Sequence, residues 1–275
     1  MKRRQEIFLK AFINECSPEK QESLLQFLSE KEREKIGALP DYPLPSNPPK
    51  ANPLDLIHWS WLTPILQNYE ERDQKLFLLA LRPKMQKSLE KELDISPSTD
   101  PISSTGVSFL RGVLFSSLRK EEILPPEYLP PSPMNLLLDI EKKKLIQLID
   151  LLSLYDLAVE LRQIVETKIL QKIYSFLSEE EKLFLKAIAG HKEPYPAAKI
   201  SLDLWDGSQK SLRSTLHRIG LSRLGSALSG QDPDLIWYVC HGLDSGRGKV
   251  LEKLSSQEAL PQVAEWLIEK MKEFL

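Results

Sequence analysis

The sequence predicts an all-α protein, a multi-helix bundle of short capped helices in two modules joined by proline-rich connectors. Three observations support this prediction. Apolar residues recur at helical spacing through most of the 275 residues, while the alternation typical of strands is almost absent. Several of these segments begin with good helix-capping residues. Proline is abundant, with 20 residues against 11 glycines, and it must lie outside helix interiors.

The composition indicates a globular protein that is long enough to bury a core, since 41% of its residues are hydrophobic and 28% are charged. The 37 basic residues balance 39 acidic ones, and no segment has the strong basic excess of a DNA-binding arm. We find neither the apolar core of a signal peptide nor the ~20 apolar residues of a membrane span. We therefore expect a cytoplasmic protein with no nucleic-acid partner.

In the first half of the chain, local signals mark the starts of several helices. Ser17 and Pro18 suit the N-cap and first position of a helix, and Ser29 to Glu32 form a capping box. Gly37 suits the end of the helix that this box opens. Helices are expected around residues 8–12 and 18–28, and then over residues 30–36, 54–66, 74–81, 83–93 and 105–118.

In the second half, Ser178 to Glu181 form another capping box, and Asp232 with Pro233 repeats the N-cap and proline pair. The glycines at 220 and 225 are expected to interrupt a helix. Residues 246–249 read Gly-Arg-Gly-Lys, but they lack the spacing of a phosphate-binding loop and are interpreted as a turn. Helices are expected over residues 136–152, 155–177, 179–189, 208–228 and 234–243, and residues 255–275 are expected to form a final helix or a pair of helices.

Prolines concentrate in residues 40–53 and 125–133, and both windows are interpreted as stiff connectors. The alternative is that they are docking peptides for SH3-like partners. The predicted organisation is an N-terminal helical module over 1–120 containing the linker 40–53, a second linker over 121–133, and a C-terminal helical module over 134–275.

One short sequence pattern occurs in both halves. Residues 25–32, Leu-Gln-Phe-Leu-Ser-Glu-Lys-Glu, resemble residues 174–181, Tyr-Ser-Phe-Leu-Ser-Glu-Glu-Glu. Each is a helix end with an aromatic residue and leucine, followed at once by a capping box. Two interpretations stay open: any capped helix pair looks like this, or the chain holds two copies of one helical unit.

The sequence has no histidine or cysteine pair at the spacing of metal ligands or of a catalytic pair. Cys240 and His241 are neighbours on an expected helix and point ~100° apart, so they do not form a nucleophile and base. Cys240 is expected to be a core thiol, and His58 a half-buried helix residue. We expect no catalytic residues, no metal site and no cofactor, and the protein is predicted not to be an enzyme.

The best basic stripe lies in residues 208–228, where Arg213 and His217 share one helix face. Residues 215–222 could pass as the corner of a DNA-binding helix-turn-helix. The balanced charge of the surrounding residues favours a polar helix face or a protein contact instead. We therefore predict Arg213 and His217 to be partner-binding residues.

Residues 204–254 resemble the flagellar rotor switch protein family, FliG, and the cytosolic adaptor of type III secretion sorting platforms. In the flagellar family a helix starts at a Glu-His-Pro-Gln motif, and an apolar helix and a Leu-Asp pair follow. Here residues 231–234, Gln-Asp-Pro-Asp, occupy that place, and Leu243 and Asp244 form the pair. Of these four residues, only Pro233 matches the motif strictly. The charged torque helix has no clear match, so a secretion-machine relative is expected, similar in overall pattern to chlamydial type III secretion accessory proteins.

This resemblance implies a non-enzymatic structural adaptor that bridges the inner-membrane ring of a secretion apparatus and its cytosolic pods. Its partners would be ring or pod components, which would hold it peripheral to the inner membrane. The partner-binding residues would include Asp232, Pro233, Asp234, Trp237 and Tyr238. Either aromatic residue could be an exposed anchor, with core packing as the alternative. The other functions considered are a type III secretion chaperone or other helical protein-binding module, and an enzyme or nucleic-acid binder without a recognisable motif.

Overall fold

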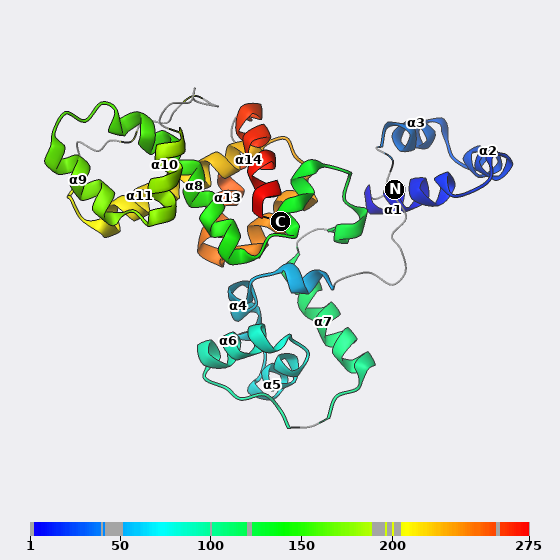
Figure 1. Cartoon of the computed structure of the whole chain (residues 1–275). Coiled ribbons are helices and arrows are strands. Elements are labelled where there is room, and N and C mark those ends of the chain that lie inside the picture. Colours follow the sequence, from blue (N-terminus) through cyan, green and yellow to red (C-terminus); the bar gives the residue numbers. More distant parts are fainter. Residues whose placement is uncertain are drawn as a thin grey trace. The chain divides into compact units, whose positions relative to one another are not determined.

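The computed structural model shows an all-α, multi-helix protein, which confirms the predicted fold class (Figure 1). Its described residues form fourteen α-helices and four short 3₁₀-helices and contain no strand. No helix in this part of the chain is long and apolar enough to cross a membrane. The described residues are 3–39, 41, 52–99, 101–119, 123–188, 196, 200, 205–256 and 259–274.

The chain divides into two compact units. The first comprises residues 1–135 together with 232–245, and the second comprises residues 136–231 together with 246–275. Helix α12 (Pro233–Gly242) therefore belongs to the first unit, although it lies late in the sequence. The division into modules 1–120 and 134–275 stays a prediction, because contacts do not test independent folding. Most of the expected connector 40–53 lies outside the described residues.

The first unit begins with three short helices, α1 (Arg3–Asn14), α2 (Pro18–Gln26) and α3 (Glu30–Ala38). Ser17 is the N-cap of α2 with Pro18 in its first turn, and the capping box at Ser29 is present, so both predicted starts are confirmed. On one face of α1, Ile7 and Ala11 are buried against Leu124.

In the first unit, residues 54–66 do not form the single helix that was expected. Residues 54–66 form two 3₁₀-helices and one α-helical turn, because the His58 amide donates to the His241 carbonyl at 2.8 Å instead of continuing a helix. In the window 125–133, Leu129 is buried, so this segment packs against the unit. The elements are η1 (Pro53–Leu56), η2 (Trp59–Trp61), α4 (Thr63–Leu66), α5 (Glu71–Leu79), α6 (Pro83–Leu93), α7 (Ser104–Leu118) and η3 (Pro126–Tyr128).

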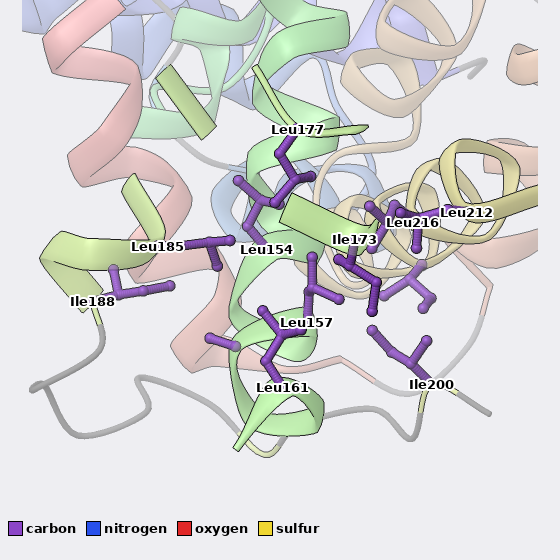
Figure 2. Close-up of a cluster of buried hydrophobic side chains, with 12 residues drawn as sticks. Leu154, Leu157, Leu161, Ile173, Leu177, Leu185, Ile188, Ile200, Leu212 and Leu216 are labelled. Atoms are coloured by element: carbon purple, nitrogen blue, oxygen red, sulfur yellow. The ribbon is translucent and has the colours of Figure 1, made fainter. Parts of the chain in front are cut away.

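The second unit packs its helices around α8 and α11, and Figure 2 shows the apolar side chains that meet between them. Leu154 and Leu157 of α8 lie against Ile173 of α9, Leu185 of α10 and Leu216 of α11. The 3₁₀-helix η4 (Pro133–Leu138) precedes α8. The helices are α8 (Lys142–Leu161), α9 (Thr167–Phe176), α10 (Glu179–Ile188), α11 (Gln209–Leu228), α13 (Ser245–Leu254) and α14 (Pro261–Phe274).

Three expectations about this unit were wrong. The break expected near residue 153 falls at residues 162–166, because α8 is buried on more than one side and its apolar pattern shows no interruption there. Residues 246–249 belong to α13 and do not form a turn; Gly248 is buried within that helix. Helix α11 runs without interruption through Gly220 and Gly225. The expected end of α10 at Gly190 lies outside the described residues.

The two glycines of α11 allow close contact between backbones. A Cβ atom at Gly220 would lie 1.9 Å from the carbonyl oxygen of Ile149 in α8. A Cβ atom at Gly225 would lie 2.6 Å from the Cβ of Leu254 at the end of α13. These positions therefore require the absence of a side chain, and α11 rests directly on α8 at Gly220.

A buried ion pair lies on the same helix pair. Arg223 of α11 donates from Nε to Asp156 of α8 at 3.0 Å and from a terminal nitrogen at 2.5 Å. It also donates to the Pro196 carbonyl at 2.7 Å. Both side chains are buried, so removing one partner would leave an uncompensated charge, at a cost of about 3–5 kcal/mol.

Substituting Gly220→Ala is expected to destabilise the protein by about 3 kcal/mol, because the new methyl group overlaps a backbone carbonyl that cannot move aside. Urea unfolding followed by circular dichroism measures this change. The matched control is Gly112→Ala in α7, where nothing lies within 4 Å of the added Cβ. That change should stabilise the helix by about 0.5–1 kcal/mol. Equal stability of the two variants would contradict the close contact.

Candidate functional site

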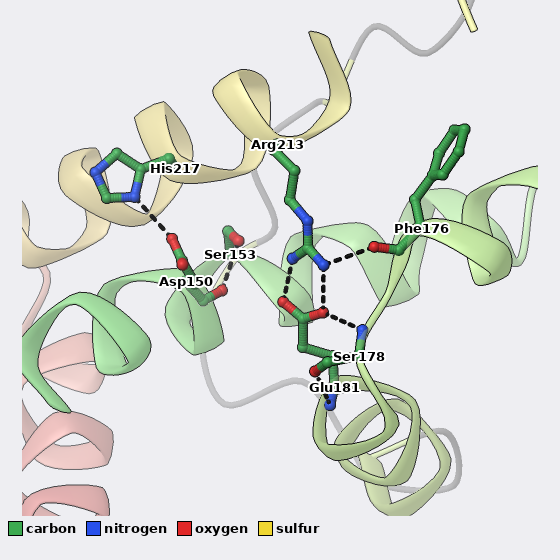
Figure 3. A network of polar contacts seen from close by, with 7 residues as sticks. All are labelled: Asp150, Ser153, Phe176, Ser178, Glu181, Arg213 and His217. Carbon is green, nitrogen blue, oxygen red and sulfur yellow. Dashed lines mark hydrogen bonds and ion pairs between the residues drawn. The ribbon is translucent and has the colours of Figure 1, made fainter. Parts of the chain in front are cut away.

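A polar cluster in the second unit lies where α8, α10, α11 and α13 meet, and Figure 3 shows most of its members. Its side chains line a cavity of about 400 Å³. The cluster includes Arg213 and His217, the two residues of α11 that the sequence predicted to bind a partner. The polar side chains of the cavity are Asp150, Ser153, Glu181, Arg213, Ser214, His217 and Arg247.

Arg213 ties the turn between α9 and α10 to α11. Its guanidinium donates to both carboxylate oxygens of Glu181, with the bond to Oε2 at 2.8 Å. It also donates to the carbonyl of Phe176, the last residue of α9, at 2.6 Å. One side chain of α11 thus binds the end of one helix and the first turn of the next.

Glu181 takes part in both the capping box and the ion pair with Arg213. Its Oε2 accepts from the Ser178 amide at 2.7 Å, and its own amide donates to Ser178 Oγ at 3.2 Å, which confirms the second predicted capping box. Burial acts to raise the pKa of Glu181, but the hydrogen bonds from Arg213 and Ser178 outweigh it and hold the pKa below its ordinary value. The hydrogen bond to Glu181 raises the pKa of Arg213.

His217 joins α8, α11 and α13. Its Nδ1 lies 2.7 Å from Asp150 Oδ1, and its Nε2 lies 2.7 Å from Nε of Arg247. A guanidinium can only donate, so Nε2 accepts from Arg247 and Nδ1 carries the hydrogen that is donated to Asp150. Ser153 Oγ donates to the backbone carbonyl of Asp150 at 2.6 Å.

The bonds within the cluster favour a structural role. A serine-type triad requires the histidine Nε2 to face the nucleophile, and at His217 that position is taken by Arg247. Glu181 and Asp150 are each met by a basic side chain of α11. No group of three histidine, cysteine or acidic side chains within the described ranges could hold a metal ion. The cluster is suited to hold α11 against three other helices.

The other predicted partner-binding residues lie in the first unit, at the start of α12. Asp232 is its N-cap and accepts from the Asp234 amide at 2.9 Å, as its sequence predicted, and Pro233 follows. Asp234 is buried and accepts from the Leu124 amide at 3.3 Å. Tyr238 is buried as well, and its hydroxyl donates to the Leu124 carbonyl at 2.8 Å. Of the two interpretations of Tyr238, the structure agrees with core packing, because that carbonyl satisfies its hydroxyl inside the core.

Trp237 is half-buried within a stack of aromatic rings. The His241 ring lies between it and Trp61, with ring centroids 4.0 and 4.1 Å apart. The Phe115 ring meets Trp237 edge-on at 5.8 Å. Much of the Trp237 ring is thus in contact with other side chains of its own unit. Cys240 is buried, which confirms the predicted core thiol.

Sequence reasoning missed Asp150, Glu181 and Arg247 as members of the polar cluster. Asp150 could have been identified from the sequence, because an acidic residue within the apolar stretch of α8 needs a polar partner if it is buried. Glu181 was assigned only its capping role. Arg247 was placed in a turn, so its proximity to α11 was not foreseen.

Comparisons of the chain with protein-family models, with curated proteins and with solved structures found no match. The similarity of residues 204–254 to rotor switch proteins and sorting-platform adaptors stays a prediction.

The Glu181 ion pair is expected to make stability depend on pH. Because its pKa is lower in the folded state, its contribution is complete above the ordinary value of 4.5 and is lost as the pH falls through the folded value. Glu181→Gln should cost about 1–2 kcal/mol at pH 7, and this difference from the wild type should shrink toward pH 3. Denaturant unfolding at several pH values measures it.

The control for this experiment is Glu180→Gln, which removes an exposed carboxylate from the same helical turn. It is expected to leave the free energy of unfolding unchanged at every pH. A Glu181→Gln difference that is independent of pH would show that the carboxylate charge does not stabilise the fold.

Proposed function

We propose that the chain is a non-enzymatic structural adaptor that binds protein partners through helical faces in a cytosolic assembly of the type III secretion, flagellar-switch-like class. The observation that carries the partner-binding part is the uncovered apolar surface of α1–α3. Phe27 is 85% exposed and Phe12 is 55% exposed, while α2 buries no residue. Large aromatic side chains left in solvent are typical anchors of protein interfaces.

The second unit supports this interpretation by contrast. There, short helices of similar length bury at least one large apolar side chain each, Ile173 in α9 and Leu185 in α10, although Leu183 of α10 stays 63% exposed. Short helices owe most of their stability to packing of an apolar face. Helices α1–α3 have only part of that packing, which favours a partner protein that supplies the missing apolar contacts.

Two further observations support the adaptor proposal. The polar cluster uses its charged side chains to hold helices together, as expected of a scaffold. The similarity of residues 204–254 to sorting-platform adaptors supports the secretion assembly as the setting. Asp232 and Pro233 lie at the start of α12, in the place that the partner-binding motif holds in that family.

Affinity capture of the tagged full chain from its native cells tests the proposal. The wild type is expected to recover ring and pod components of a secretion apparatus. The double variant Phe12→Ser with Phe27→Ser should recover at least tenfold less, because it removes both exposed anchors. Phe109→Ser, which changes another exposed phenylalanine on α7, is the matched control and should recover them normally.

Circular dichroism of all three proteins checks that the substitutions leave the helices intact. Recovery that is unaffected by the double variant would contradict binding through α1–α3. Recovery of a single secreted effector, without ring or pod components, would support a chaperone and contradict the adaptor.

A further inference from the structure

Helices α1–α3 and α8–α10 follow the same plan. In each, a first helix is followed by a second helix, at whose end stands a Phe-Leu pair. A capping-box serine comes next and begins the third helix. The backbone bonds at the two turns agree: Leu28 donates to Leu25 at 3.2 Å, as Leu177 does to Tyr174 at 3.3 Å. This agreement supports the interpretation of two copies of one helical unit.

The capping boxes of the two copies also correspond. The Ser29 amide donates to Glu32 Oε2 at 3.0 Å, and the Ser178 amide donates to Glu181 Oε2 at 2.7 Å. The side-chain and backbone hydrogen bonds from Ser29 lower the pKa of Glu32. At Glu181 burial acts to raise the pKa, and the hydrogen bonds from Arg213 and Ser178 lower it. Glu32 therefore occupies the same position at the turn between α2 and α3 as Glu181 does at the turn between α9 and α10.

In the second copy the turn is covered by α11. Arg213 binds Glu181 and the Phe176 carbonyl (Figure 3). On either side of it, Leu212 and Leu216 belong to the same buried cluster as Ile173 and Leu177 (Figure 2). An arginine between two leucines thus covers both the polar and the apolar parts of the turn.

In the first copy, the described stretch 52–66 that comes after α3 forms only the short elements η1, η2 and α4, none of which has the length of α11. Within the described part of the chain, no basic side chain hydrogen-bonds to the Glu32 carboxylate and none donates to the Phe27 carbonyl, while Arg33 Nε donates to the next carbonyl, that of Leu28, at 3.0 Å. Phe27 is 85% exposed, whereas its counterpart Phe176 is half-buried beside Trp205.

We propose that the turn between α2 and α3 is a docking site for an amphipathic helix of a partner protein. That helix presents an arginine to Glu32 and to the Phe27 carbonyl. It places leucines one residue before and three residues after the arginine against Leu24 and Leu28. The inference rests on the proposed function, since it names the chemistry of the partner helix that the adaptor binds.

A fluorescent peptide with the sequence of residues 208–222 tests this site, because it carries the arginine and leucines of α11. Fluorescence anisotropy with the full-length protein should show saturable binding. Glu32→Gln in the protein is expected to weaken binding about tenfold, and so is Arg213→Gln in the peptide, since each removes a charged hydrogen-bonding partner. Combining the two changes should cost little more than either alone.

Glu19→Gln, an exposed acid on α2 outside the turn, is the matched control and should leave the affinity unchanged. Absence of saturable binding would overturn the proposal. Binding that is insensitive to Glu32→Gln, or that is weakened by Glu181→Gln instead, would also overturn it. If the peptide fails while cell capture still depends on Phe12 and Phe27, the chemistry of the partner helix is wrong and the adaptor function stands.

Discussion

The direct backbone contact between α8 and α11 is the constraint on which the rest of the second unit depends. Gly220 lets α11 approach the Ile149 carbonyl, and the buried pair of Asp156 and Arg223 fixes how the two helices align. With α11 held there, Arg213 reaches the turn between α9 and α10. The polar cluster and the apolar core are both consequences of this one placement.

The first unit exposes an apolar surface because its α1–α3 helices lack such a covering helix among the described residues. Its α1–α3 copy has the capping box and the Phe-Leu helix end, but the described stretch 52–66 after it forms only short elements, whereas α11 covers the second copy. Leu24 and Leu28 are only half-buried as a result, and Phe27 stays in solvent. A helical unit that lacks one of its layers can bury more apolar surface when it binds a partner. This burial is the physical basis of the adaptor proposal.

Local signals allowed the helix starts at Ser17, Ser29, Ser178 and Asp232 to be predicted, because a cap is formed by residues within one turn. Tertiary packing decided what was missed. Gly220 suggested a break because glycine disfavours helices, yet the helix is retained there since only glycine fits against α8. The polar cluster could not be assembled from the sequence, as its charges come from four separate helices.

Hydrogen exchange of the full chain, followed by mass spectrometry, tests most directly whether the covering helix stabilises each copy. The account predicts that amides of α9 and α10 are protected, whereas those of α2 and α3 exchange much faster because they open locally. Arg213→Ala should increase exchange in α9 and α10 and leave α2 and α3 unchanged. Equal protection of the two copies in the wild-type chain would contradict the account.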